Sequence, residues 1–99
     1  MVFSKFIIEG SSLIMAKCTY HKQLATNKDD VKGGGWFRFD ADKKEFILGG
    51  SSHDFGPVDI EDLKKCIETD NVYGNSRQSR KMLGFNFLFD IGSSIIPLN

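Results

Sequence analysis

The residues best suited to chemistry lie in the segment 49–56, which reads G-G-S-S-H-D-F-G. The segment follows an apolar run and leads into a helix start near Asp59. Glycines let successive backbone N–H groups point the same way and form an anion-binding concavity, and a following helix adds the positive end of its dipole. The pattern therefore predicts an anion-binding loop at residues 50–56. An ordinary flexible turn is the alternative.

His21 is the second candidate, because it stands where a predicted strand gives way to a helical turn. Functional side chains often gather at such strand ends. An imidazole titrates near neutral pH and acts there as a base or a nucleophile. The alternative is a half-exposed histidine that merely begins a helical turn.

The remaining histidine and the cysteines do not add a metal site. His53 lies inside the loop, and we expect its side chain to face solvent while the loop acts through its backbone. The spacing of His21, His53 and Cys18 does not form a preformed ligand set, so we predict no metal. Cys18 and Cys66 lack the C-x-x-C spacing of zinc and redox sites, and we expect two buried free thiols.

The composition indicates one folded domain, residues 1–99, with 40% hydrophobic and 12% aromatic residues. Thirteen basic residues balance thirteen acidic ones, so no net field favours a nucleic acid or an anionic membrane as a partner. The basic cluster at residues 77–81 is typical of a solvated loop. The amino-terminal residues do not form a signal sequence, and the longest apolar run is interrupted by polar residues, so a cytoplasmic protein is expected.

The elements that must position these residues are strands and a helix. Asp59 is a predicted N-cap, and Ile60, Leu63 and Ile67 repeat at the spacing of one apolar helix face. A short helix or helical turn is expected to open at His21. Glycines 33–35 are expected to punctuate the chain before a strand resumes. Six strands are predicted, at residues 2–9, 13–20, 36–39, 45–48, 83–89 and 95–96.

This pattern predicts an α/β (α+β) fold. A single mixed six-stranded sheet with two helices, in the order ββαββαββ, buries the apolar stripes of both kinds of element. Phenylalanines alternate strictly in the strand at 83–89 and should line the core.

The central part of the chain resembles the Janus, or phosphohistidine phosphatase, family of small α/β proteins. The resemblance rests on Tyr20 and His21, followed by G-G-G-W-F-R-F-D-A-D-K-K-E-F-I-L-G-G-S-S-H-D-F-G-P. Proteins of that family carry a catalytic histidine after a tyrosine at a strand end. This histidine is followed by a triple glycine at the start of a strand. A lysine-bearing hairpin comes next, and then a G-x-S-x-x-[FY]-G loop that leads into a helix. The similarity extends from Lys5 to about Ile67.

The resemblance implies a phosphatase that acts on phosphohistidine without a metal or other cofactor. Its partner would be a phosphorylated protein or a small anion. The family's catalytic histidine falls on His21. Its phosphate-binding positions fall on the lysine of the first strand and on the loop, namely Lys5, Ser52, His53, Asp54 and Gly56.

The chain departs from the family pattern where charge is needed. Trp36 and Leu13 stand where the family has arginines, and the segment between His21 and Gly33 is shorter. Bidentate arginine is a strong clamp for the charge that develops in phosphoryl transfer.

Three functions therefore remain open. The first is a phosphohistidine phosphatase-like enzyme with His21 as nucleophile or general base. The second is a non-catalytic module of the same fold that binds phosphate, another anion or a protein, which aromatic residues such as Trp36 and Phe55 favour. The third is a small scaffold with an ordinary loop.

Overall fold

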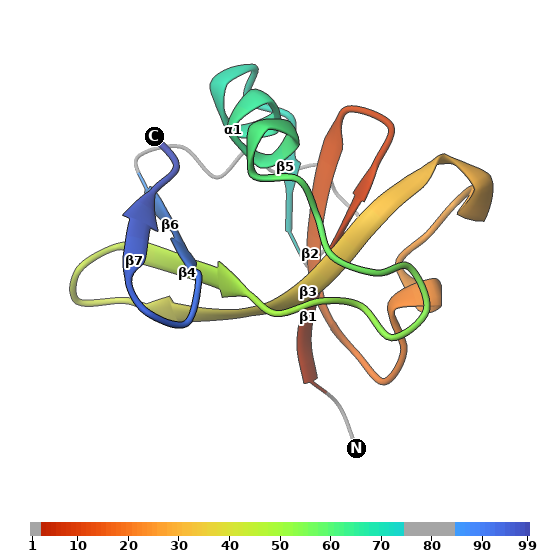
Figure 1. Cartoon of the computed structure of the whole chain (residues 1–99), viewed down its shortest axis with the longest axis horizontal. Helices are drawn as coiled ribbons and strands as arrows, with labels where there is room; N and C mark the ends of the chain where they lie inside the picture. Colours follow the sequence, from red (N-terminus) through yellow and green to blue (C-terminus); the bar gives the residue numbers. More distant parts are fainter. Residues whose placement is uncertain (1–2, 75–84) are drawn as a thin grey trace.

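The computed structural model describes residues 3–74 and 85–99 (Figure 1). These residues form one strongly curled mixed sheet of seven strands in the order β5-β2-β1-β3-β4-β6-β7, with an α-helix packed on one face. The strands are β1 Phe3–Glu9, β2 Ser12–Cys18, β3 Val31–Asp40, β4 Glu45–Gly49, β5 Val72–Tyr73, β6 Asn86–Asp90 and β7 Ile95–Pro97. The helices are α1 Ile60–Glu68 and two short 3-10 turns, η1 His21–Gln23 and η2 Lys28–Asp30.

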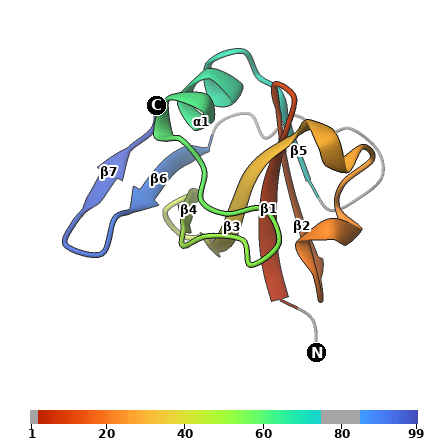
Figure 2. The same cartoon turned by 45° about the vertical axis from the view of Figure 1, so that its right-hand side comes forward.

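Two parallel pairings make the sheet mixed. β1 pairs antiparallel with β2 and β3 on either side, and β4 continues the sheet antiparallel to β3. β6 then pairs parallel with β4, and β5 pairs parallel with β2. The chain between β4 and α1 runs across β3 and β1 before it turns back to the helix (Figures 1 and 2). This crossing brings the glycine-rich loop over the middle of the sheet.

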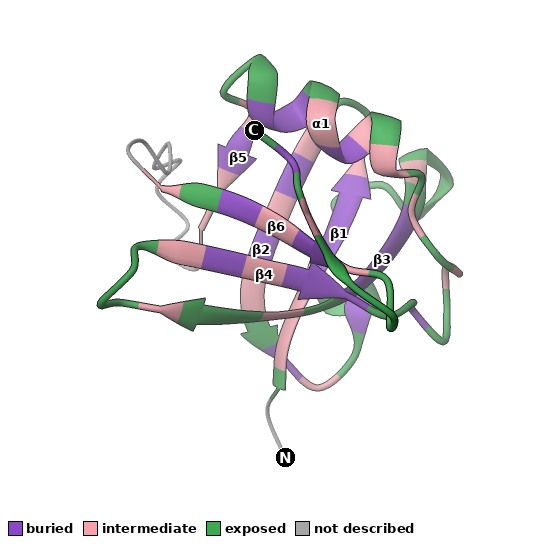
Figure 3. Ribbon diagram, turned by 60° about the vertical axis from the view of Figure 1, so that its left-hand side comes forward, coloured by how far each residue is buried: buried purple, intermediate pink, exposed green. Residues whose placement is uncertain are grey.

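The main core lies between α1 and one face of the sheet, where buried residues alternate along the strands (Figure 3). Asp59 caps α1, because its Oδ1 accepts a hydrogen bond of 2.9 Å from the Glu61 amide. Phe46 stacks on Phe87 at a ring separation of 5.4 Å, as the alternation of phenylalanines predicts. The opposite face of the sheet is not covered by α1.

On that opposite face the central strands carry Lys5, Ile7, Gly34 and Trp36. Lys5 and Ile7 alternate with the core residues of β1 and therefore point away from α1. Trp36 lies directly across from Lys5 on β3, and Gly34 lies across from Ile7. Ile7 is fully buried although it stands outside the main core cluster. Something other than α1 must cover it.

The mixed α/β character, the first two strands and the capped helix are confirmed. The predicted counts differ, since the described residues contain seven strands and one α-helix. The short helix or helical turn expected to open at His21 is the 3-10 turn η1. β5 was not among the predicted strands. Two residues are too short for a periodic signal, and this strand exists because it pairs with β2.

The triple glycine is the other difference. Residues 33–35 lie inside β3, which begins at Val31, instead of preceding a strand. Glycine usually weakens a strand because it has no side chain to pack. A glycine inside a strand therefore often marks a place where another group approaches the backbone closely.

Two predictions fall outside the described residues: the solvated basic loop at 77–81 and the start of the strand at 83–89. Within the described part of the chain, no helix is long and apolar enough to span a membrane.

Candidate functional site

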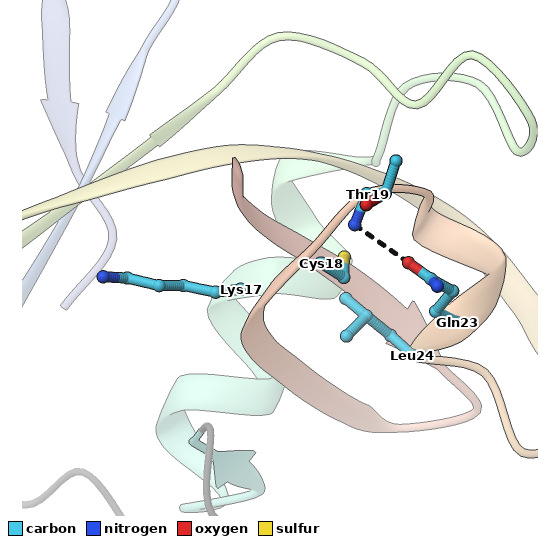
Figure 4. A pocket seen from close by; sticks show the side chains of 5 residues that line it. All are labelled: Lys17, Cys18, Thr19, Gln23 and Leu24. Carbon is cyan, nitrogen blue, oxygen red and sulfur yellow. Dashed lines mark hydrogen bonds between the residues drawn. The ribbon is translucent and has the colours of Figure 1, made fainter. Parts of the chain in front are cut away.

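His21 begins the 3-10 turn η1 directly after β2. The turn is held by Gln23, whose Oε1 accepts a hydrogen bond of 2.8 Å from the backbone amide of Thr19 (Figure 4). The same oxygen accepts a bond of 2.9 Å from the amide of Tyr20. These bonds satisfy two amides that the end of the strand would leave without partners. The strand end is therefore fixed, and the histidine side chain folds back onto the sheet.

The His21 ring lies against β3, and its orientation is set by one hydrogen bond. Its Nε2 is 2.8 Å from the carbonyl oxygen of Gly35. A carbonyl oxygen only accepts, so Nε2 carries the proton, and Nδ1 of the neutral ring keeps a lone pair. No fully buried side-chain nitrogen or oxygen in the described residues lacks a partner, and no described residue bonds to Nδ1. Nδ1 therefore retains access to solvent.

The environment also favours the neutral imidazole. Only 6% of the His21 surface is exposed. Burial lowers the pKa of His21 below its ordinary value, and the positive charge of Lys5 lowers it further, while the bond to the Gly35 carbonyl and the charge of Asp54 act in the opposite direction. At neutral pH the ring is thus a base or nucleophile with its lone pair on Nδ1.

The triple glycine allows both the ring and the loop to reach β3. A Cβ atom on Gly34 would lie 2.5 Å from the Phe6 carbonyl oxygen and 3.0 Å from Cδ2 of His21. A Cβ atom on Gly33 would lie 2.3 Å from the carbonyl oxygen of Pro57. Real side chains do not fit at these distances. The glycines are therefore required by close approach on this face.

The loop after β4 is closed by its own hydrogen bonds. Ser52 is 3% exposed, and its hydroxyl oxygen accepts from the amides of Asp54 at 3.2 Å and Phe55 at 3.1 Å. Ser52 and Gly56 also exchange both backbone bonds, and the Gly56 carbonyl accepts from the Gly34 amide at 3.1 Å. The loop is thus a compact turn anchored to β3, and not a flexible connection.

A pocket of about 280 Å³ opens where the loop, β1 and His21 meet. His21, Lys5 and Ser51 bring the polar chemistry, and Phe3 and Trp36 supply most of the apolar wall. The full lining consists of Phe3, Ser4, Lys5, His21, Gly35, Trp36 and Ser51. A histidine, a serine and a lysine thus line one small cavity.

The predicted site residues divide into two groups. His21 and Lys5 come together in the pocket, although 16 positions separate them in the chain. The loop contributes Ser51 to the lining, whereas Ser52 is engaged within the loop. His53 and Asp54 are exposed, in line with the expected solvent-facing side chain of His53.

The loop amides differ in what they can still bind. The amides of Ser52, Asp54 and Gly56 already donate within the loop. The His53 amide donates to no other residue in the described ranges. The roles assigned to Lys5, Ser52, His53, Asp54 and Gly56 in binding phosphate remain predictions.

Sequence reasoning missed Ser51 and the Gly35 carbonyl. Two serines adjoin in the loop, and residue types alone do not decide which one faces the cavity. The carbonyl of Gly35 carries no side-chain signal, so only the fold reveals that it holds the imidazole.

The two positions that lack the expected arginines have different surroundings. Leu13 is fully buried in the main core, so no side chain at this position reaches the pocket from the present backbone. Trp36 lines the pocket, and the Arg38 guanidinium lies over its ring at 5.7 Å from the centroid. A cation therefore stands beside the pocket wall without being part of the lining.

A second pocket lies beside η1 and contains the Cys18 thiol (Figure 4). Burial raises the pKa of Cys18, so the thiol stays protonated and is a weak nucleophile. Both cysteines are free and buried, as expected. In the described ranges, no three His, Cys, Asp or Glu side chains gather as a set that could hold a metal ion.

Comparison of the chain with protein-family models, with curated proteins and with solved structures gave no match. The assignment of a function therefore rests on the geometry of the His21 pocket.

Proposed function

We propose that this protein binds phosphoryl compounds in the His21 pocket and hydrolyses them without a metal, as a phosphohistidine phosphatase-like enzyme. The observation that carries the proposal is the shared cavity of His21, Lys5 and Ser51. A neutral imidazole with a free Nδ1 is a suitable nucleophile or general base. The ammonium group of Lys5 suits the negative charge of phosphoryl oxygens.

Two routes are consistent with this chemistry. In the first, Nδ1 attacks phosphorus, an N–P bond forms as the bond to the leaving group breaks, and water then hydrolyses the phosphorylated His21. In the second, Nδ1 takes a proton from a water whose oxygen attacks phosphorus, the bond to the leaving group breaks, and the imidazolium returns the proton to the leaving group. Both routes consume one water and release inorganic phosphate and the dephosphorylated compound. In both, the bond to the Gly35 carbonyl keeps Nε2 protonated and directs the reaction to Nδ1.

The non-catalytic alternative has its own support. Several loop amides are already bonded within the loop, and no arginine is among the lining residues of the pocket. A module of this kind would hold an anion or a phosphorylated protein through Lys5 and the pocket without turning it over.

The His21→Gln variant separates these functions. The glutamine side-chain amide nitrogen can take the place of Nε2 and donate to the Gly35 carbonyl, but it has no basic nitrogen. We expect phosphate release from phosphoramidate and from a phosphohistidine peptide to fall roughly 10²- to 10⁴-fold, the usual contribution of an acid–base group. Binding of inorganic phosphate should change little.

His53→Gln is the matched control, because it changes only an exposed side chain outside the pocket lining and keeps the backbone amide of residue 53. It should hydrolyse phosphoramidate at the wild-type rate. Equal rates for wild type and His21→Gln would overturn the catalytic proposal. Phosphate binding without any turnover by the wild type would establish the binding module instead.

A further inference from the structure

Two aromatic rings form the apolar wall of the His21 pocket. Phe3 and Lys5 are two residues apart on β1 and so project from the same face of the sheet. Trp36 lies directly opposite Lys5 on β3. The lysine is therefore flanked by Phe3 along its own strand and by Trp36 across the sheet.

Both rings keep accessible surface, and the Lys5 ammonium lies 5.4 Å from the centroid of the Phe3 ring. Phe3 is 48% exposed and Trp36 is 37% exposed. Single exposed apolar side chains are common, but these two line the same cavity as the imidazole and the ammonium group. The pocket thus combines a charged part with an apolar aromatic part.

Trp36 is held in place by its neighbours. A Cβ atom on Gly50 would lie 2.5 Å from Cδ1 and Nε1 of Trp36, so the indole packs closely on the loop backbone. Arg38 lies over the same ring. A ring fixed in this way loses little conformational entropy when a ligand packs beside it.

We infer that the pocket takes a small phosphoryl compound whose phosphoryl group is attached to a planar apolar ring. The inference rests on the proposed function, since Lys5 and His21 receive the phosphoryl group. The ring contacts Phe3 and Trp36, where offset or edge-to-face packing between aromatic groups is favourable. The ring is also the part that leaves when the phosphoryl group is transferred.

The size of the cavity agrees with a ligand of this kind. Its volume of about 280 Å³ lies just below the range of roughly 300–1000 Å³ that is usual for small-molecule sites. One ring and one phosphoryl group fit such a volume, whereas a dinucleotide does not.

The test compares inorganic phosphate, cyclohexyl phosphate and phenyl phosphate by titration calorimetry. Trp36 is the sole tryptophan of the chain, so its fluorescence reports independently that the ligand occupies this pocket. We expect phenyl phosphate to bind about tenfold more tightly than inorganic phosphate and a few-fold more tightly than cyclohexyl phosphate. The difference corresponds to the free energy that an aromatic contact contributes.

The Phe3→Leu variant should lose most of the preference for phenyl phosphate and keep the affinity for inorganic phosphate. Phe39→Leu is the matched control, because Phe39 is 47% exposed and lies outside the pocket lining. It should keep the preference.

The outcomes distinguish the two proposals. If inorganic phosphate binds and the ring adds no affinity, or if Phe3→Leu weakens both ligands equally, this inference is overturned and the proposed function stands. If neither ligand binds, both are overturned.

Discussion

At the residue scale, the function proposed for the pocket depends on the protonation state of His21. The hydrogen bond to the Gly35 carbonyl fixes the tautomer of His21, and burial disfavours the imidazolium. Together they leave Nδ1 without a proton. The sequence identified His21 as a candidate because of its place at a strand end. It did not reveal the tautomer, which is set by a backbone atom 14 residues away.

The lowered pKa of His21 predicts how stability varies with pH. Below the ordinary histidine pKa of about 6.5, the unfolded chain binds a proton that the folded chain resists. The stability that the neutral ring contributes is therefore present above this pH and is lost as the pH falls toward the folded pKa. Urea unfolding between pH 7.5 and 5 should show a smaller loss of unfolding free energy for His21→Gln than for the wild type.

His53→Gln provides the comparison for this experiment, because it removes an exposed histidine from the same molecule. Its profile should follow the wild type. A wild-type profile that superimposes on that of His21→Gln would mean that the ring is as easily protonated in the folded protein as in the unfolded chain.

At the element scale, β3 is the strand that assembles the site. It supplies the carbonyl that orients His21, and its glycines admit both the imidazole and the loop. Sequence patterns predicted most strands and α1, since those depend on local periodicity and capping. They placed the glycines before a strand, because a glycine within a strand is explained only by what packs against it.

Gly34→Ala should therefore disturb the fold and the site together. The added methyl group meets the Phe6 carbonyl and the His21 ring, and overpacking of this kind costs about 1–3 kcal/mol. We expect a lower free energy of unfolding in urea and a slower release of phosphate from phosphoramidate, because the ring is displaced from Gly35.

Gly92→Ala is a control for the general cost of replacing a glycine. No atom lies within 4 Å of a Cβ atom there, and the cost comes from its φ of +93°. It should lower stability by about 1 kcal/mol and leave the rate of phosphate release unchanged. A Gly34→Ala variant as stable and active as the wild type would contradict the role given to β3.

At the scale of the whole molecule, the two faces of the sheet have different tasks. One face packs against α1 and holds most of the core, and the other face carries the pocket. The pocket brings Ser51 of the loop to His21, whereas the convergence of His21 with the loop residues 52–56 on one anion remains a prediction. The sequence could not select Ser51 over Ser52, because that choice depends on how the closed loop sits on β3.

The most direct test of this convergence is an NMR titration of the protein with inorganic phosphate. We expect the resonances of His21 Nδ1 and of the Ser51 and His53 amides to shift together and to report one dissociation constant. Lys5→Gln should weaken that single constant. If phosphate shifts the resonances of the loop amides and leaves those of the His21 ring unchanged, the imidazole and the loop do not form one site. The same conclusion follows if the ring and the loop amides report different dissociation constants.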